Sequence, residues 1–157
     1  MKLLCDQMLG TLARWLRLLG FDVYYANEKT TDDEILDIAE KEKRVVISRD
    51  EQLVERAEKR RMPNIEVTST DLDEQLKTVT SVYPVNNKTV LSRCSLCNTP
   101  LLKVKKEDVK GKVPSKVFDA HEEFWYCKKC DKIYWKGSHW VRIEEKMKEL
   151  TEKVKAS

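Results

Sequence analysis

Two Cys-x-x-Cys pairs constrain this chain more than any other feature of its sequence: Cys94 with Cys97, and Cys127 with Cys130. The two residues inside each pair let the backbone turn until both thiolates face one ion, and four thiolates fill the tetrahedral shell of a structural zinc site. The sequence begins with no secretory signal pattern, so we expect a cytoplasmic protein whose cysteines bind metal rather than form disulfides. We therefore predict a Cys₄ zinc ribbon without an open coordination position. A redox dithiol is the alternative.

The first eighty residues alternate between short apolar strands and helices. Strands are expected at 2–5, 21–25, 44–48 and 65–67, and helices at 8–19, from 32 onwards, at about 51–61 and at 72–79. Gly20 is placed to end the first helix, and Thr31 with Glu34 has the form of a capping box at the start of the second. This alternation predicts an α/β fold, a parallel sheet with helices on both faces.

Charge is distributed unevenly along the chain. Residues 1–90 carry a net charge of −3 and residues 91–157 a net charge of +6, within a total of +3. An acidic first part joined to a basic second part is typical of a nuclease-like site with an appendage that holds nucleic acid. A lysine-rich, solvated terminal helix is the simpler explanation.

We expect three parts: a core domain at 1–85, a zinc-ribbon module at 92–140 with a lysine-rich insertion at 103–116, and an amphipathic helix at 141–157. Residues 83–87 read as a linker. The terminal helix carries four apolar residues at near-heptad spacing: Ile143, Met147, Leu150 and Val154. They are expected to pack against the chain's own body or to form a contact in a homodimer. No apolar stretch approaches the roughly 20 residues of a membrane span, so no membrane partner is expected.

Three acidic residues follow predicted strands: Asp6, Asp32 and Asp50. In an open parallel sheet, ligands bind at the carboxyl ends of the strands, so these residues are expected at one edge. Carboxylates that converge repel one another unless a cation neutralises them, and Mg²⁺ or Mn²⁺ prefers such oxygen ligands. An ion held there can activate water for phosphodiester cleavage. Taken singly, Asp32 could be a helix N-terminal charge and the other two could be turn residues.

Five stretches carry a family pattern: 6–22 (DQMLGTLARWLRLLGFD), 32–36 (DDEIL), 44–50 (RVVISRD), 93–98 (RCSLCN) and 127–140 (CKKCDKIYWKGSHW). Together they resemble the Mut-seven C-terminal RNase domain family, which joins a PIN-like ribonuclease core to a zinc ribbon. The resemblance implies a PIN-like three-layer α/β/α fold and a metal-dependent endoribonuclease that hydrolyses RNA. It implies Asp6, Asp32 and Asp50 as catalytic acids and ligands of Mg²⁺ or Mn²⁺, with Asp33 as a possible additional acid. Gln52 is neutral where many relatives of the fold carry a further acid, so one or two catalytic metals are possible.

Basic residues are expected to contact phosphates. Arg14 and Arg17 lie on the first predicted helix and match arginines of the family pattern, although arginines at this spacing are often a solvated face. Arg49, beside Asp50, is placed to clamp a phosphate or to pair with a carboxylate of the site.

The predicted ribbon mixes aromatic residues with cations. Exposed rings beside lysines would stack unpaired RNA bases, and Lys128, Lys129 and His139 are candidate RNA-binding residues. Small ribbons also use aromatic residues to pack against a main domain. The alternation of a strand puts Phe124 and Tyr126 on one face and the residue between them on the other.

Two other function classes fit parts of the pattern. A non-catalytic RNA-binding protein on a degenerate PIN-like scaffold is favoured by Gln52. A phospho-receiver domain shares the alternating sheet, but it needs an acid pair after the first strand and has no reason to carry a zinc ribbon. Removal of zinc is expected to unfold 92–140 and to leave the α/β core largely intact.

Overall fold

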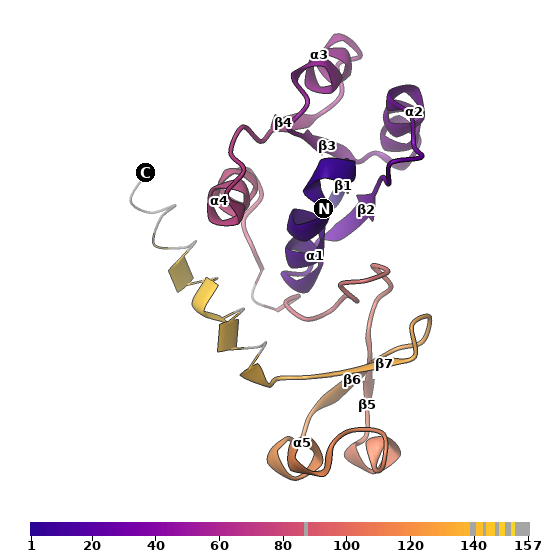
Figure 1. Ribbon diagram of the computed structural model, residues 1–157, viewed down its shortest axis with the longest axis vertical. Helices are drawn as coiled ribbons and strands as arrows, with labels where there is room; N and C mark the ends of the chain where they lie inside the picture. Colours follow the sequence, from indigo (N-terminus) through magenta and orange to yellow (C-terminus); the bar gives the residue numbers. More distant parts are fainter. Residues whose placement is uncertain (87, 139–140, 143, 147, 150–151, 153–157) are drawn as a thin grey trace.

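The computed structural model describes residues 1–86, 88–138, 141–142, 144–146, 148–149 and 152 of the 157-residue chain (Figure 1). Its first part contains a parallel sheet of four strands in the order β2-β1-β3-β4. The strands are β1 (Lys2–Cys5), β2 (Asp22–Tyr25), β3 (Val45–Ser48) and β4 (Asn64–Glu66). They alternate with the 3-10 turn η1 (Gln7–Leu9) and the helices α1 (Gly10–Leu18), α2 (Asp32–Glu42), α3 (Glu51–Lys59) and α4 (Leu72–Val82).

Helices cover both faces of this sheet, as the alternation predicts (Figure 1). On one face, α1 and α4 pack against Leu3 and Cys5 of β1 in a large buried cluster. On the other face, α2 and α3 pack against Leu4 and Val46. Successive strand residues point to opposite faces, so a strand covered on both sides reads as a continuous apolar run. The expected three-layer α/β architecture is confirmed.

The structure contains both of the helix caps that the sequence predicts. The side chains of Thr31 and Glu34 form the expected capping box at the start of α2. Gly20 has a φ of +100° just after α1, and the N–H of Phe21 donates to the carbonyl of Leu16 at 3.0 Å. This is the Schellman-type ending in which glycine meets no Cβ penalty. A Cβ at Gly20 would also lie 2.4 Å from the carbonyl oxygen of Thr89, so the chain packs tightly here.

The second part is an antiparallel sheet in the order β5-β6-β7, formed by β5 (Leu102–Val104), β6 (Phe124–Cys127) and β7 (Lys132–Trp135). The 3-10 turn η2 (Lys106–Val109) and the helix α5 (Ser115–Ala120) lie between β5 and β6. We call residues 92–138 the cysteine module. Its register pairs Trp125 with Tyr134 and Phe124 with Trp135, so Phe124 and Trp125 take opposite faces, as alternation predicts.

The predicted linker is not a free connection. Tyr83 and Val85 are partly buried against the core, and the N–H of Leu91 donates to the carbonyl of Leu18 at 2.9 Å. In the terminal segment, Lys146 forms an ion pair with Asp73 of α4. The four apolar residues of the predicted terminal helix, Ile143, Met147, Leu150 and Val154, lie outside the described residues. In the described part of the chain, no helix is long and apolar enough to cross a membrane.

Candidate acidic site and cysteine cluster

The structure places Asp6, Asp32 and Asp50 around one small cavity of about 60 Å³, which we call the acidic pocket. The strand-edge rule therefore brings together three residues that are far apart in sequence. The remaining lining residues come from η1, from the loop after β2, and from α2 and α3: Gln7, Met8, Asn27, Thr30, Ile35 and Leu53. Ile35 and Leu53 are buried, and they give the pocket an apolar side.

Asp6 and Asp50 are linked through Ser48. Asp6 follows β1, is buried, and accepts a hydrogen bond from the N–H of Met8 at 3.1 Å. Its other carboxylate oxygen accepts the hydroxyl of Ser48, the last residue of β3, in a short hydrogen bond. The oxygen of Ser48 in turn accepts the N–H of Asp50 at 2.9 Å. The Ser48 hydroxyl therefore holds the ends of β1 and β3 together beside the pocket.

Helix N-termini position the other two aspartates. Asp50 is the N-cap of α3 and accepts the N–H of Gln52 at 2.9 Å. Asp32 is the first residue of α2, directly after the N-cap Thr31. The positive end of each helix dipole stabilises a carboxylate at these positions. A capping role and a place in the pocket are therefore compatible.

Asp33 does not line the acidic pocket. Its side chain is 72% exposed and forms an ion pair with Arg56 of α3. Another nitrogen of Arg56 lies 3.7 Å from a carboxylate oxygen of Asp32. Of the two adjacent aspartates, the structure therefore brings Asp32 into the pocket and turns Asp33 to a surface ion pair.

The surroundings of Asp6 disfavour the charged form of its carboxyl group. Burial raises the pKa of the Asp6 carboxyl above its usual range, and the charges of Asp50 and Asp32 raise it further. Hydrogen bonds from Ser48 and Met8 oppose this rise. A carboxylate with a raised pKa in the folded protein costs stability once it ionises, because the unfolded chain ionises more easily.

We expect Asp6→Asn to be more stable than wild type at neutral pH by about 1 kcal/mol, as removal of active-site charge often is. The melting temperature would rise by about 2–4 °C. The difference should vanish at acidic pH, where Asp6 is protonated, and should grow as the pH rises through its raised pKa. Thermal unfolding against pH, in buffer without added Mg²⁺ or Mn²⁺, measures it. An Asn variant that is less stable at neutral pH would contradict this expectation.

Arg17 is not positioned to bind phosphate, contrary to the expectation from the sequence. It is buried, and its guanidinium donates to the carbonyl of Val23 at 2.8 and 3.0 Å. It also donates to the carbonyls of Ser95 and Leu96 at 3.1 and 3.2 Å. A helix arginine that donates four hydrogen bonds to three backbone carbonyls holds structure together, and here it joins the core to the cysteine module.

The remaining candidate RNA-binding residues differ in exposure. Arg14 is exposed on α1, and Lys128 and Lys129 are exposed on the turn between the last two cysteines. Arg49 is half-buried, and its Nε has no hydrogen-bond partner among the described residues. His139 lies outside the described residues.

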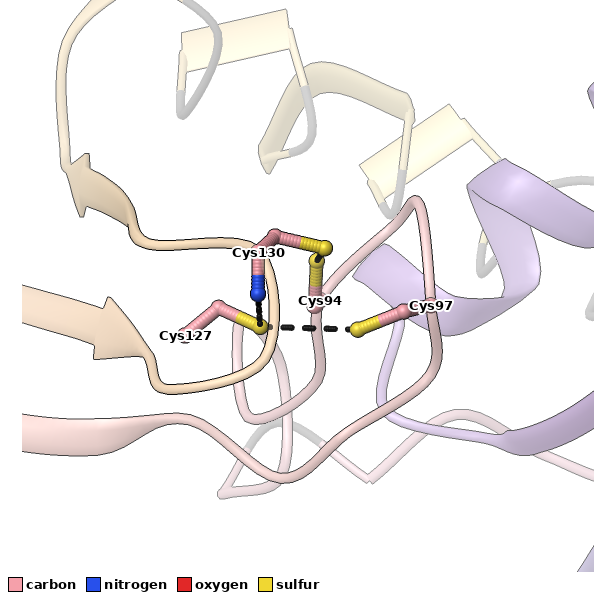
Figure 2. Close-up of side chains that lie close together, drawn as sticks. All are labelled: Cys94, Cys97, Cys127 and Cys130. Carbon is pink, nitrogen blue, oxygen red and sulfur yellow. Dashed lines mark hydrogen bonds between the residues drawn. The ribbon is translucent and has the colours of Figure 1, made fainter.

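The four cysteines converge from two loops, as Figure 2 shows. Their sulfur atoms all lie within 4.8 Å of one another, with Cys97 and Cys127 at 3.4 Å and Cys94 and Cys130 at 3.9 Å. Four sulfurs bound to zinc at about 2.3 Å would lie about 3.8 Å apart. The cluster is therefore compatible with a zinc ribbon. Among the described residues, the three aspartates of the acidic pocket do not form a group as close as this.

Each cysteine pair is followed by a residue in the left-handed region, Asn98 with a φ of +70° and Asp131 with a φ of +53°. Asn and Asp accept this conformation more readily than most residues. The N–H of Asn98 donates to the carbonyl of Cys94 at 2.9 Å, which closes the first turn. Burial opposes ionisation of Cys97, but its hydrogen bonds with Thr99 lower its pKa to about 6.

The cysteine module docks at the opposite end of β2 from the acidic pocket. The side chain of Asn98 accepts the N–H of Val23 at 3.0 Å and donates to Asp22 at 2.7 Å. Arg44 donates to the same oxygen of Asp22 at 2.9 Å. Burial alone would raise the pKa of Asp22, but these two hydrogen bonds bring it below its ordinary value. The junction is therefore a polar network rather than a flexible hinge.

A family model of the Mut7-C RNase domain matches residues 1–147. This chain belongs to the Mut7-C RNase domain family. The match spans both the α/β core and the cysteine module, so the two parts belong to one family pattern. No curated protein and no solved structure matches the chain at a significant level.

In this Mut7-C domain, the pocket also contains polar residues that were not among the predicted site residues. Asn27 and Thr30 line it from the loop after β2, at the same sheet edge as the aspartates. Their oxygens are additional polar groups of the pocket, and the position of both residues just after a predicted strand is the signal that points to them. Met8 is 58% exposed and also lines the pocket, although its apolar spacing predicts a place in the core.

Proposed function

We propose that this protein is a metal-dependent endoribonuclease in which Asp6, Asp32 and Asp50 hold Mg²⁺ or Mn²⁺ at the acidic pocket. The observation that carries the proposal is the convergence of three strand-end aspartates in one cavity. The chain in which they converge belongs to an RNase domain family, which supports RNA as the substrate.

The donor set of the acidic pocket fits a hard divalent cation. All three aspartates offer carboxylate oxygens, and neither lysine nor arginine is among the described residues that line the cavity. Nη1 of Arg56, which does not line the cavity, lies 3.7 Å from Oδ2 of Asp32. Asp6 and Asp50 have no cationic partner among the described residues. Hard oxygen ligands of this kind suit Mg²⁺ and Mn²⁺. A bound ion would supply an activated water and neutralise charge on the phosphate.

The protein's own groups would hold this chemistry in place. Ser48 fixes the orientation of Asp6 through its hydroxyl, and the α3 N-terminus fixes Asp50. Arg14 and Arg49 are the candidates for contact with the RNA phosphates. In the hydrolysis, the oxygen of water bonds to phosphorus and the bond from phosphorus to a ribose oxygen breaks. One new end carries the phosphate and the other carries the hydroxyl.

We infer that the cysteine cluster holds a structural Zn²⁺ ion and that the cysteine module assists RNA binding. Four thiolates at these separations fit the tetrahedral zinc shell and leave no position for a water. Lys128 and Lys129 are exposed beside the cluster and add positive charge there. Zinc would then brace the fold, while the acidic pocket carries the reaction.

Substitution of Asp50 tests the proposal with a matched control. Asp50→Asn keeps a good N-cap on α3 but removes the charge, and we expect it to lower Mn²⁺-dependent cleavage of a mixed RNA pool at least a hundredfold, which is about 2.7 kcal/mol. Asp71 is the N-cap of α4 and does not line the pocket, so Asp71→Asn should cleave like wild type. Mn²⁺ should also raise the melting temperature of wild type and of Asp71→Asn more than that of Asp50→Asn.

The second candidate function is a non-catalytic RNA-binding protein on this scaffold. Gln52 favours it, since its neutral side chain occupies the position of a further acid, and it contacts the site through its backbone N–H, which donates to the capping carboxylate of Asp50. RNA binding by wild type, with no Mn²⁺-dependent cleavage and no Mn²⁺-dependent rise in melting temperature, would select this function and reject the nuclease.

A further inference from the structure

A large cavity of about 800 Å³ opens in the cysteine module, away from the acidic pocket. Its floor is one face of the β5-β6-β7 sheet, and the segment 108–114 forms its opposite side; we call it the insertion pocket. Its volume is in the range of small-molecule sites. Its apolar and aromatic lining includes Val104, Val109, Val113, Tyr126, Ile133 and Trp135, and Cys130 of the cysteine cluster also borders it.

Tyr126 and Trp135 do not belong to the main buried cluster. Trp125 pairs with Tyr134 on the face that packs against the main buried cluster. Tyr126, Ile133 and Trp135 lie on the other face, which forms the floor of the insertion pocket. Half-buried rings on the outer face of a small sheet are therefore available to a ligand.

The surroundings of the insertion pocket are cationic. Residues 101–136 carry ten lysines and six acidic residues. Two of those acids, Glu122 and Glu123, already pair with lysines of the module. Lys112 and Lys132 line the pocket, and neither has a carboxylate within 4.0 Å among the described residues. The ammonium of Lys132 lies 5.0 Å from the centre of the Tyr134 ring, on the face of β7 that points away from the pocket, so Lys112 is the cation on the pocket's own side.

The two acidic residues at the insertion pocket do not cancel this charge equally. Asp131 accepts the hydroxyl of Tyr126 at 2.7 Å, so one of its oxygens is already engaged. Asp108 also lines the cavity, from η2. Lys112 therefore shares the pocket with one partly satisfied carboxylate and one that has no hydrogen bond or ion pair among the described residues, in a module with a surplus of lysines.

The insertion pocket continues towards the core. A second hollow of about 150 Å³ shares Lys132, Ile133 and Trp135 with it and reaches Leu18 and Leu91. The two hollows thus lie on either side of the edge strand β7. This arrangement suits an extended ligand better than a compact one.

We propose that the insertion pocket binds an unpaired base of single-stranded RNA, stacked on Trp135 or Tyr126. Lys112 holds a phosphate beside that base. The inference rests on the proposed function for its choice of RNA, and it adds the substrate class: a duplex keeps its bases stacked and paired, and cannot place one in this pocket.

Binding of a short fluorescent single-stranded oligoribonucleotide, measured by anisotropy without added Mg²⁺ or Mn²⁺, tests the proposal. Loss of one stacking partner is worth about 1–3 kcal/mol, so Trp135→Ala should weaken binding about five- to hundredfold, and Trp135→Phe should restore most of it. Lys112→Ala should weaken binding and reduce the salt dependence, whereas Lys116→Ala, in the same insertion on α5 but outside the pocket, should not. Zinc content and melting temperature establish that each variant is folded.

Equal affinity of folded, zinc-loaded Trp135→Ala and wild type overturns the proposal and assigns the pocket to another occupant, such as a protein segment. Equal affinity of wild type for single-stranded and duplex RNA overturns it as well. Binding that depends on Trp135 without any cleavage would support the insertion pocket and reject the nuclease. Cleavage that depends on Asp50, with no effect of Trp135→Ala on binding, would support the nuclease and reject the insertion pocket.

Discussion

Cys94→Ser should lose the bound metal and should unfold well below the temperature of wild type, in the core as well as in the cysteine module. Structural zinc contributes about 10–16 kcal/mol of apparent binding energy in small modules at neutral pH. Removal of one of four thiolates forfeits much of this energy. The expected loss of stability is therefore several kcal/mol, which is a large fraction of what a domain of this size possesses.

The core is affected because the two parts share buried contacts. Cys94, Cys127 and Tyr134 belong to the same buried cluster as α1 and β1. The hydroxyl of Tyr134 lies 3.0 Å from the sulfur of Cys94. The sequence alone predicts that the core would survive loss of zinc largely intact, but these contacts couple the two parts.

Circular dichroism during heating, zinc analysis and limited proteolysis would measure the effect, with a chelator as the second route to the metal-free protein. Cys5→Ala is the matched control, because Cys5 is buried in β1 and is not one of the four clustered cysteines. It should lose some packing energy and keep its zinc. Loss of metal with an unchanged melting temperature, or proteolysis confined to 92–138 around a core of wild-type stability, would refute the coupling.

Arg17→Met should destabilise the protein by about 3–5 kcal/mol, because several backbone carbonyls lose their charged hydrogen-bond donor. The guanidinium of Arg17 satisfies the carbonyls of Val23, Ser95 and Leu96. Methionine fills similar space, but it leaves these acceptors without donors, and each buried unsatisfied acceptor costs about 1–3 kcal/mol. Arg17→Lys should recover part of the loss, since one ammonium cannot reach all three carbonyls.

Urea unfolding of Arg17→Met beside Arg14→Met gives a matched comparison on one helix. Arg14 is exposed, so its substitution should change stability by no more than about 0.5 kcal/mol. If Arg17→Met were as stable as Arg14→Met and bound RNA more weakly than wild type, the phosphate-binding role expected from the sequence would be restored and the structural role rejected.

The sequence was sufficient for the α/β core because two independent signals agree there. Strands such as Val45–Ser48 are apolar throughout, which requires cover on both faces, and the capping box at Thr31 marks the start of a helix. The same strand order places Asp6 and Asp50 at one sheet edge. The acidic pocket follows from topology, and topology can be read from the chain.

The contacts between the two parts could not be read in this way. Arg17 meets carbonyls that lie 78 and 79 positions further along the chain, and no local pattern announces such a partner. A helix arginine in a nuclease-like sequence therefore looks like a phosphate ligand. Which of Asp32 and Asp33 lines the pocket likewise depends on a distant residue. Arg56 of α3 pairs with Asp33, and it lies more than twenty positions further along the chain.

The contacts of Asn98 and Arg17 with Val23 protect an edge of the parallel sheet. β2 is an outer strand of the sheet, and the N–H and C=O of Val23 are both taken by these side chains. An unprotected outer strand is a template for pairing with another chain. A zinc ion at the cysteine cluster would hold the turn that carries Asn98, and we expect it to keep the molecule from polymerising through its own sheet as well.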